Sequence, residues 1–445
     1  MRTPFRNVDA SWLRMDDPVN LMVVTGVLVL GAPVPVARLR ERVEKRLLRF
    51  RRFTNRVVPP FAGVGLPAWE PDPDFDLDRH LQVTRLGAGA GEPTLQAFVS
   101  RLLSEPLPAD RPLWSIHFVE HFQGGSAIVA RIHHCIGDGL ALVHVLLSMA
   151  DGTPDPARSD PRARASFAIT LGEQVLRGAT ALLGHPGRIG DLARLASGSA
   201  GALLGLLTLP DDPPTGLKGP LGREKVAAWS RPIDLDDFKA IGRATGSTVN
   251  DVLMAALAGA LRRFLLARGE TLRDIEVRGV VPVNLRRPEA AGRLGNRFGL
   301  VFLALPLGLE DPLERLFEVR RRMRALKDTP QAMAIYQVLW AMGVAPRPVF
   351  DLALRIFAAK GTAVVTNVVG PRQEIAIAGA PLREAMFWVP SAGRLALGVS
   401  LLSYAGKVWL GLQCDAAVVP DPAGVLAGFG AEVEELLDLR RQAGE

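Results

Sequence analysis

The chain has 445 residues, of which 48% are apolar and 22% charged, and its formal net charge is +7. This length predicts two or at most three domains in a folded globular protein. The basic balance favours an anionic partner such as a phospholipid surface or a phosphorylated small molecule. Because no nucleic-acid-binding motif is present, no nucleic acid partner is expected.

The number of cysteines and the length of the apolar runs indicate the cellular compartment. Two cysteines, Cys135 and Cys414, provide neither a disulfide framework nor a metal-ligand cluster, so no metal site is expected. Charged residues interrupt every apolar run before Pro33, which argues against a signal peptide. No uninterrupted apolar run reaches the roughly 18–20 residues of a bilayer span. We therefore expect a cytoplasmic protein, soluble or attached peripherally to the inner membrane face.

The first 150 residues alternate between strand and helix patterns. A run rich in β-branched residues predicts a strand at 22–30, and Pro33 and Pro35 separate it from helical spacing over 36–50. The patterns that follow predict a helix, two strands with a Gly124–Gly125 turn between them, and an apolar helix, at 94–103, 114–120, 126–132 and 140–149. The segment HHCIGDG, which begins at His133, therefore joins a strand to a helix.

Composition shifts after residue 150. Residues 151–165 and 211–222 are rich in Pro and Gly, whereas 167–209 are helical in composition but irregular. This predicts a crossover segment with helices of its own between two larger domains. The expected division is 1–150, 151–222 and 223–445.

The second half repeats the mixed pattern. Thr248 is placed to cap a helix that ends near Arg268, and Pro346 and Pro348 divide two apolar helices within 332–360. Strands are predicted at 275–283, 300–305 and 362–368, a hairpin at 395–404 and 407–412, and a closing helix at 422–441. We therefore predict an α/β fold for both halves.

The segment HHCIGDG carries the residues best suited to chemistry. Imidazole is the side chain whose pKa suits a general base near neutral pH. Neighbouring strand residues face opposite ways, so only one of His133 and His134 is expected to point into a given cleft. Asp138 lies within reach for fixing a tight turn, and Gly137 and Gly139 allow the backbone to bend there.

This segment resembles the HHxxxDG signature of the coenzyme A-dependent acyltransferases, and the chain as a whole resembles the bacterial wax ester synthase/diacylglycerol acyltransferase family. Matching segments run in order across nearly the whole chain. They are VDASWLRMD near the start, FDLDRHL, RPLW, TVNDVLMAALAGALRRFL, VPVNLRRP, GNRFG and TNVVGP. HHxxxDG alone indicates only the superfamily, whereas the ordered set is far more specific.

The resemblance implies two chloramphenicol-acetyltransferase-like domains, each a mixed β-sheet flanked by helices, with a tunnel at their interface. It makes His134 the general base, which takes the proton of an alcohol that attacks acyl-CoA directly, without an acyl-enzyme. Asp138 is then structural and pairs with an arginine that the sequence does not identify. His133 supports the pocket.

The resemblance also implies substrate-binding residues from the second half. They are Asn250 and, after a strand, Thr366 and Asn367, with Gly139 from the signature itself. A capping box accounts for Asp251, whereas for Asn250 a contact with substrate or oxyanion stays open. The family usually reads Ser-Asn-Val-Pro-Gly-Pro where this chain has TNVVGP, so a hydroxyl is kept at Thr366.

The implied function is transfer of a fatty acyl group from acyl-CoA, a substrate rather than a cofactor, to a long-chain alcohol or diacylglycerol. The product is a wax ester or triacylglycerol. Arg286 and Arg287 are candidates for the coenzyme A phosphates, and the RPLW segment is expected to be architectural. Apolar residues 202–209 and 337–359 are candidates for contact with a membrane or lipid inclusion, although core packing explains them equally well.

Alternatives remain at this point. One is a condensation-type enzyme with an amine or a peptidyl thioester as acceptor, and another is a non-catalytic lipid-binding relative. Cys135 as a thiol nucleophile has no support from its sequence surroundings. Three further histidines, His80, His117 and His144, are expected to be core residues.

Overall fold

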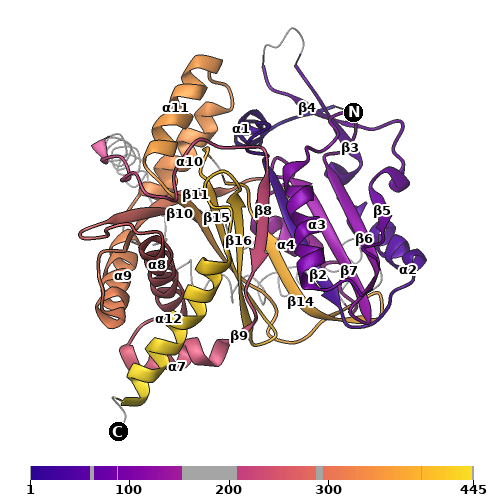
Figure 1. The fold of residues 1–445 in the computed structure, drawn as a ribbon. Coiled ribbons are helices and arrows are strands. Elements are labelled where there is room, and N and C mark those ends of the chain that lie inside the picture. Colours follow the sequence, from indigo (N-terminus) through magenta and orange to yellow (C-terminus); the bar gives the residue numbers. More distant parts are fainter. Residues whose placement is uncertain are drawn as a thin grey trace, which may run out of the picture.

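The computed structural model describes residues 2–60, 65–87, 89–152, 208–286, 294–327, 329–391 and 393–442, without the side chains of Leu140 and His144. These residues form an α/β fold with two mixed sheets side by side, each flanked by helices (Figure 1). A third, small sheet in the first half has the order β1-β4-β3 and consists of β1 (Thr3–Pro4), β4 (Ala68–Pro71) and β3 (Asn55–Val58).

The first sheet has the strand order β13-β14-β2-β7-β6-β5. Strands β5 and β6 are parallel and the other neighbours are antiparallel, which makes the sheet mixed. Its strands are β2 (Val23–Leu30), β5 (Leu81–Thr84), β6 (Trp114–Phe122), β7 (Gly125–His133), β13 (Ala376–Ile377) and β14 (Ala380–Trp388). The helices of this half are α1 (Asn7–Met15), α2 (Val36–Arg42), α3 (Glu92–Ser104) and α4 (Gly139–Leu147).

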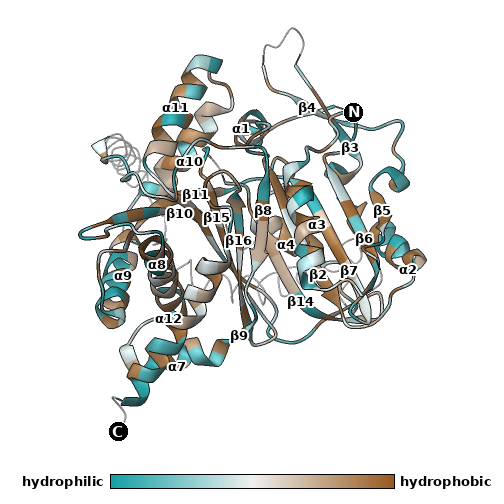
Figure 2. Cartoon of the chain, in the orientation of Figure 1, coloured by the Kyte–Doolittle hydropathy of each residue, from teal (hydrophilic) through white to brown (hydrophobic). Residues whose placement is uncertain are grey.

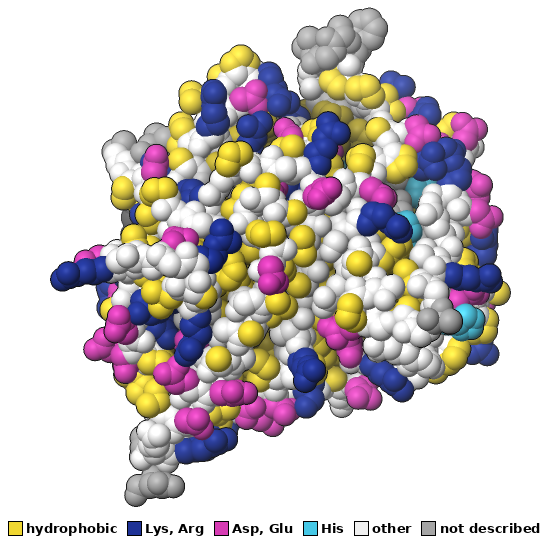
Figure 3. All heavy atoms as spheres, viewed as in Figure 1, with side chains coloured by type: hydrophobic (Ala, Val, Ile, Leu, Met, Phe, Trp, Pro, Cys, Tyr) yellow, Lys and Arg dark blue, Asp and Glu magenta, His cyan; other side chains and the backbone are white. Residues whose placement is uncertain are grey.

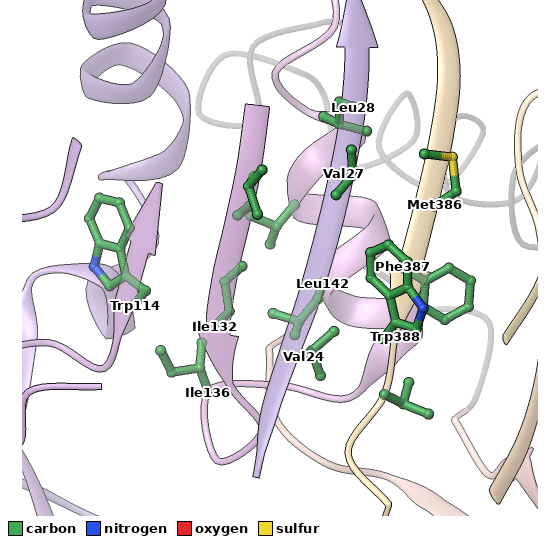
Figure 4. Close-up of a cluster of buried hydrophobic side chains, with 14 of the residues drawn as sticks. Val24, Val27, Leu28, Trp114, Ile132, Ile136, Leu142, Met386, Phe387 and Trp388 are labelled. Carbon is green, nitrogen blue, oxygen red and sulfur yellow. The ribbon is translucent and has the colours of Figure 1, made fainter. Parts of the chain in front are cut away.

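Strand β14 crosses from the second half of the chain into the first sheet. It pairs with β2 antiparallel, from Leu382 opposite Leu30 to Trp388 opposite Thr25. Figure 4 shows Met386, Phe387 and Trp388 of β14 beside the β2 side chains. The segment predicted as the second domain, 223–445, thus contributes β13 and β14 to the sheet of the first.

The second sheet has the order β11-β10-β12-β15-β16-β8, and β9 also pairs with β16. Two neighbouring pairs, β10–β12 and β12–β15, are parallel. Its strands are β8 (Lys225–Trp229), β9 (Ile233–Asp234), β10 (Glu276–Asn284), β11 (Phe298–Pro306), β12 (Ala363–Val369), β15 (Leu397–Tyr404) and β16 (Lys407–Asp415). The helices are α7 (Leu235–Thr245), α8 (Val249–Ala267), α9 (Pro312–Lys327), α10 (Gln331–Met342), α11 (Arg347–Ala359) and α12 (Ala423–Gln442).

The two faces of the second sheet belong to different cores. Ala363 and Val365 of β12 pack in a cluster with α8 and α12, whereas Val364 and Val368 belong to the cluster shared with the first half. This division follows from the alternation of side chains along a strand. One face of the sheet is therefore covered by its own helices and the other meets the first half. Figure 2 shows hydrophilic residues on the outward faces of α7 and α9.

Helix α3 of the first half covers the edge of the second sheet. Ser100 Oγ accepts a hydrogen bond from the backbone N–H of Ala227 at 2.9 Å, and Ser104 Oγ accepts one from that of Lys225, also at 2.9 Å. Unpaired N–H groups on an edge strand invite association with other chains. The two serines occupy these groups on β8 and so join the halves.

Most of the predicted elements are present within a few residues of their expected ends. The prediction for 36–50 is wrong in one respect, because the α-helix ends at Arg42 and a π-helical turn, Val43–Leu47, follows. The helices that were not predicted are α1, α7 and α9, and the strands that were not predicted are β1, β3, β4, β5, β8, β9, β13 and β14. The crossover segment falls largely on residues 153–207, outside the described part of the chain. Among the described helices, none combines the length and the apolar character that a bilayer span requires.

Candidate active site

His134 follows the last residue of β7 and lies between the two halves. Its backbone N–H donates to the carbonyl oxygen of Met22 at 2.7 Å. Its imidazole stacks on the Trp12 indole of α1, with ring centroids 4.0 Å apart, and lies 5.7 Å from the ring of Phe298 at the start of β11. An aromatic residue from each half therefore contacts the imidazole.

The surroundings of His134 keep it neutral. Only 4% of the residue is exposed, and its Nδ1 is buried without a hydrogen-bond partner among the described residues. Burial lowers the pKa of His134 to about 4, because removal from water disfavours the charged imidazolium; the carboxylate of Asp138 acts in the opposite direction but does not offset it. A neutral imidazole at pH 7 has a free lone pair, which a general base requires.

His133 has different neighbours from His134. Its Nδ1 accepts a hydrogen bond from the backbone N–H of Cys135 at 3.1 Å, and its Nε2 lies 3.6 Å from Asp16 Oδ1. The ring is 3% exposed and its partners differ from those of His134. The contact with Cys135 ties the His133 ring to the turn that follows β7.

Asp138 holds this turn against the second half of the chain. Its Oδ1 accepts hydrogen bonds from Arg286 Nη1 at 2.5 Å and from the backbone N–H of Ala141 at 3.0 Å, and its Oδ2 accepts one from the backbone N–H of Arg297 at 3.1 Å. Asp138 thus has the expected arginine partner, and that partner is Arg286. Both side chains are almost fully buried, at 6% and 5% exposed.

The same ion pair corrects one prediction. Arg286 was a candidate for the coenzyme A phosphates, but it is buried against Asp138 and also donates to the carbonyl oxygen of Gly295. A guanidinium committed in this way has no free face for a phosphate, so the prediction is wrong. Arg287 lies outside the described residues.

The two signature glycines leave room for neighbouring atoms, and neither adopts a backbone conformation that requires glycine. Neither Gly137 nor Gly139 has a positive φ, so the expected sharp bend does not depend on a left-handed conformation. A Cβ at Gly137 would lie 3.3 Å from Ala141 Cβ, tighter than ordinary contact. At Gly139 the nearest atom would be Val389 Cγ1 at 4.0 Å, so the first turn of α4 has room beside it.

The structure separates Thr366 from Asn367. Thr366 is 5% exposed and shares a strand face with Val364 and Val368, which pack in the same cluster as Trp12 and Phe298. Thr366 is therefore on the face of β12 that is turned toward the first half.

Asn367 points to the opposite face, toward α8. Its Nδ2 donates to Asn250 Oδ1 at 2.9 Å, which ties β12 to the first turn of that helix. The capping box at the same helix end is present, with Thr248 and Asp251 as its members, as predicted. The structure thus brings Asn250 and Asn367 together and places Thr366 apart from both.

Sequence reasoning missed a buried polar network around the backbone of HHCIGDG. Asp9 on α1 is fully buried and accepts from Arg52 Nη2 at 2.7 Å and from the backbone N–H and Nδ2 of Asn296 at 3.0 and 2.9 Å. Arg52 Nη1 donates to the carbonyl oxygens of Cys135 and Ile136, at 2.9 and 2.8 Å. Asp9 and Asn296 lie in the segments VDASWLRMD and GNRFG, but nothing in the sequence pairs them.

Other singled-out residues are part of the core. Cys135 is fully buried among apolar side chains, and His80 is buried, with its Nδ1 2.8 Å from the carbonyl oxygen of Trp114. His117 is buried against Phe98. The predictions for these two histidines are confirmed, and the side chain of His144 lies outside the described residues. Within the described part of the chain, no three His, Cys, Asp or Glu residues are grouped as a metal site would need.

Solved structures with the same architecture include a wax ester synthase/diacylglycerol acyltransferase and condensation domains. A wax ester synthase/diacylglycerol acyltransferase from Marinobacter aquaeolei VT8 has a TM-score of 0.69 at 21% identity, covering 98% of this chain and 100% of its own. The first condensation domain of the calcium-dependent antibiotic synthetase has a TM-score of 0.64 at 17% identity, covering 99% and 96%. These likenesses establish the fold.

Comparison with models of protein families identifies the family of this chain. The wax ester synthase/diacylglycerol acyltransferase catalytic domain matches residues 5–253, and the C-terminal domain of the same family matches residues 294–437. A Mycobacterium tuberculosis relative described as "Probable diacyglycerol O-acyltransferase tgs1" is 28% identical over 463 aligned positions, covering 98% of this chain and 96% of its own length. The chain belongs to the wax ester synthase/diacylglycerol acyltransferase family and is an acyl-CoA-dependent O-acyltransferase.

Proposed function

We propose that this enzyme transfers a fatty acyl group from acyl-CoA to the hydroxyl of a diacylglycerol or a long-chain alcohol, with His134 as the general base. The observation that carries this proposal is the neutral, buried imidazole held between Trp12 and Phe298 where the halves meet. The tgs1 relative, described as a diacylglycerol O-acyltransferase, supports diacylglycerol as one acceptor.

The reaction needs one proton to move twice. His134 Nε2 takes the proton of the acceptor hydroxyl as its oxygen attacks the thioester carbonyl carbon, which forms a tetrahedral intermediate. The C–S bond then breaks, the carbonyl re-forms, and the coenzyme A thiolate takes the proton back from Nε2. Ester and free thiol result, and His134 is neutral again. No covalent enzyme intermediate forms, in keeping with the full burial of the Cys135 thiol.

Residues beside His134 have separate proposed roles. The Thr366 hydroxyl, on the strand face turned toward the first half, is the proposed donor to the oxyanion. Gly139, with room beside its Cα at the start of α4, is proposed to border the substrate. Asn250 and Asn367, which bond to each other, are proposed to fix α8 against β12 beside the substrate path.

The helical pair α10–α11 is the proposed contact with a membrane or lipid inclusion. Trp340, Val344, Val349 and Leu352 are each more than half exposed, and α11 buries only Phe350. Figure 3 shows hydrophobic and basic side chains together over this end of the molecule. Apolar side chains edged by arginine suit an anionic lipid interface.

Flotation with phosphatidylglycerol-containing vesicles tests this contact. Trp340→Ser with Leu352→Ser should reduce the floated fraction, whereas Val83→Ser, on an apolar residue of β5 that is about half exposed, should not. Equal flotation of all three proteins would contradict the assignment to α10–α11.

Thiol release from palmitoyl-CoA tests the chemistry. With hexadecanol or a diacylglycerol as acceptor, release should depend on the acceptor and should fall by about 10²–10⁴-fold in His134→Ala. His121→Ala, which changes an exposed histidine of β6, is the matched control. Acceptor-dependent release that His134→Ala leaves unchanged would exclude this base. Absence of release with either acceptor would favour a lipid-binding role, and release with an amine acceptor would favour condensation-type chemistry.

A further inference from the structure

The hydrogen bonds of Asn296 fix the orientation of its side-chain amide. Its Nδ2 donates one hydrogen to Asp9 Oδ1 at 2.9 Å and the other to the carbonyl oxygen of His134, also at 2.9 Å. Both partners are acceptors only, so the amide cannot be turned over without losing both bonds. The orientation of Asn296 Oδ1 is therefore determined.

Two polar atoms, one in this amide and one in the His134 imidazole, are buried and have no hydrogen-bond partner among the described residues. They are Asn296 Oδ1, an acceptor, and His134 Nδ1, which is a donor in one of the two neutral tautomers. Leaving a buried polar atom unpaired costs about 1–3 kcal/mol. The 2.9 Å bond from Asn296 Nδ2 to the carbonyl oxygen of His134 brings the amide next to this residue. Burial dominates the lowered pKa of His134, while its own backbone carbonyl and the Asn296 side chain both act in the opposite direction, so Nδ1 has two candidate acceptors and is bonded to neither in the described structure.

We infer that Asn296 is the positioning residue of His134: its Oδ1 accepts the Nδ1 proton and so leaves Nε2 as the basic nitrogen. The hydrogen bond at one imidazole nitrogen decides which nitrogen carries the proton. An amide carbonyl in this place favours the neutral Nδ1–H tautomer without adding a charge that would raise the pKa.

Asp9 and Arg52 make this positioning rigid. Asp9 Oδ1 holds both the backbone N–H and the side chain of Asn296, and Asp9 Oδ2 is held by Arg52. Arg52 in turn binds the two carbonyl oxygens that follow His134. Asp9 is fully buried and Arg52 is 17% exposed, so water does not compete strongly for these bonds. The base and its positioning residue are thus held by one network.

This inference rests on the proposed function of His134, and a readout other than activity separates the two. Long-range ¹H–¹⁵N spectra of protein labelled at histidine report which imidazole nitrogen carries the proton. The His134 signals are identified by their loss in His134→Ala. We expect Nδ1 protonated in the wild type and a mixture of tautomers in Asn296→Ala. Nε2 protonated in the wild type, or a tautomer unchanged in Asn296→Ala, would overturn the inference; the latter would point to the carbonyl oxygen of His134 itself as the acceptor.

Kinetics give a second test. Asn296→Ala should lower kcat by about 10–100-fold, the range seen when the hydrogen-bond partner of a metal-binding histidine is removed, with little change in KM. Asn55→Ala, at another buried asparagine, is the matched control. Loss of acceptor-dependent release in His134→Ala combined with an unchanged kcat in Asn296→Ala would remove the inference and keep the proposed function. Full activity of His134→Ala would remove both.

A charge-moving variant covers the case in which Asn296→Ala does not fold. Asn296→Asp combined with Asp9→Asn keeps side-chain size at both positions and moves the carboxylate next to the imidazole. A neighbouring carboxylate raises a histidine pKa, so the acidic limb of the kcat/KM profile should move to higher pH by one unit or more. An unmoved limb would contradict contact between position 296 and His134.

Discussion

The indole of Trp12 and the imidazole of His134 lie nearly parallel, with 18° between the ring planes. Trp12 comes from α1, more than a hundred residues before His134 in the chain. Stacking of this kind restrains rotation of the imidazole about its Cβ–Cγ bond. Trp12 therefore contacts the imidazole through its ring face, and we expect this stack to restrain the orientation of the proposed base.

Two replacements of Trp12 should separate its effect on catalysis from its effect on stability. Trp12→Phe keeps a stacking ring and should retain most of kcat. Trp12→Ala removes a 3% exposed side chain, so it should cost about 3–5 kcal/mol in unfolding free energy and lower kcat as well. Urea unfolding and steady-state kinetics on the same preparations measure both. A Trp12→Ala variant with wild-type kcat would show that the stack does not orient the base.

With His134 as the proposed base, the pH dependence of activity should follow the pKa of this residue. Since burial lowers this pKa from 6.5 to about 4, the free base persists well below neutral pH. We expect kcat/KM to stay level from pH 8 down to about pH 5.5 and to fall only at more acidic values. Circular dichroism at each pH separates inactivation from unfolding. An acidic limb centred at 6.5 would contradict the buried environment.

The contribution of His134 to the free energy of unfolding should also decrease as the pH falls. His134 in the folded protein binds fewer protons between pH 4 and 6.5 than it does in the unfolded chain. Its contribution is therefore fully present above pH 6.5 and is lost as the pH falls toward 4. His117, whose pKa burial also lowers to about 4, acts in the same direction. His133, whose pKa rises to about 10 because the lowering effect of burial is outweighed by Cys135 and Asp16, acts in the opposite direction, so the test is the difference between variants. The change in Tm from pH 7 to pH 5 should be less destabilising in His117→Phe than in the wild type.

The Asp138–Arg286 pair should be among the more sensitive ion pairs of the described structure. Arg286→Ala leaves a buried carboxylate without its cation, which costs about 3–5 kcal/mol. The exposed pair Arg347–Asp351 provides the control, because Arg347→Ala should change stability by less than about 1 kcal/mol. Thermal unfolding of both variants compares them. Equal Tm values would show that Asp138 is satisfied by its backbone partners alone.

Two helical glycines form a matched pair for packing between α8 and α12. A Cβ at Gly259 would overlap the carboxylate of Glu432, which Arg263 and Arg315 hold in place, whereas a Cβ at Gly430 meets nothing within 4 Å. Gly259→Ala should therefore lower the unfolding free energy by about 1–3 kcal/mol. Gly430→Ala should raise it by about 0.5–1 kcal/mol, because alanine favours the helix. Similar Tm values for the two variants would indicate that Glu432 moves freely.

Local patterns predicted most of the elements because hydrophobic periodicity, caps and breakers act within a few residues. Thr248 and Asp251 form their capping box as expected, and HHCIGDG joins β7 to α4. The resemblance to the family supplied His134, which no local pattern distinguishes from His133. The sequence could predict that Asp138 pairs with an arginine but not that the arginine is Arg286.

The contacts that could not be predicted are those between distant segments. Asp9 and Asn296 are 287 residues apart, and no periodicity connects them. Asn250 and Asn367 bind each other, because strand alternation turns Asn367 toward α8, and no local pattern pairs them; their contact with substrate stays a prediction. The addition of β14 to the first sheet is a choice of tertiary pairing to which the residues of β14 give no local signal.

Because β14 pairs with β2, the first sheet can be completed only after most of the chain has been synthesised. During synthesis, β2 emerges long before Trp388, so the first sheet waits for a strand made more than 350 residues later. Until then an edge of apolar strand is open to other chains. We therefore expect residues 1–150 expressed alone to aggregate. Co-expression with residues 208–445 should return them to the soluble fraction.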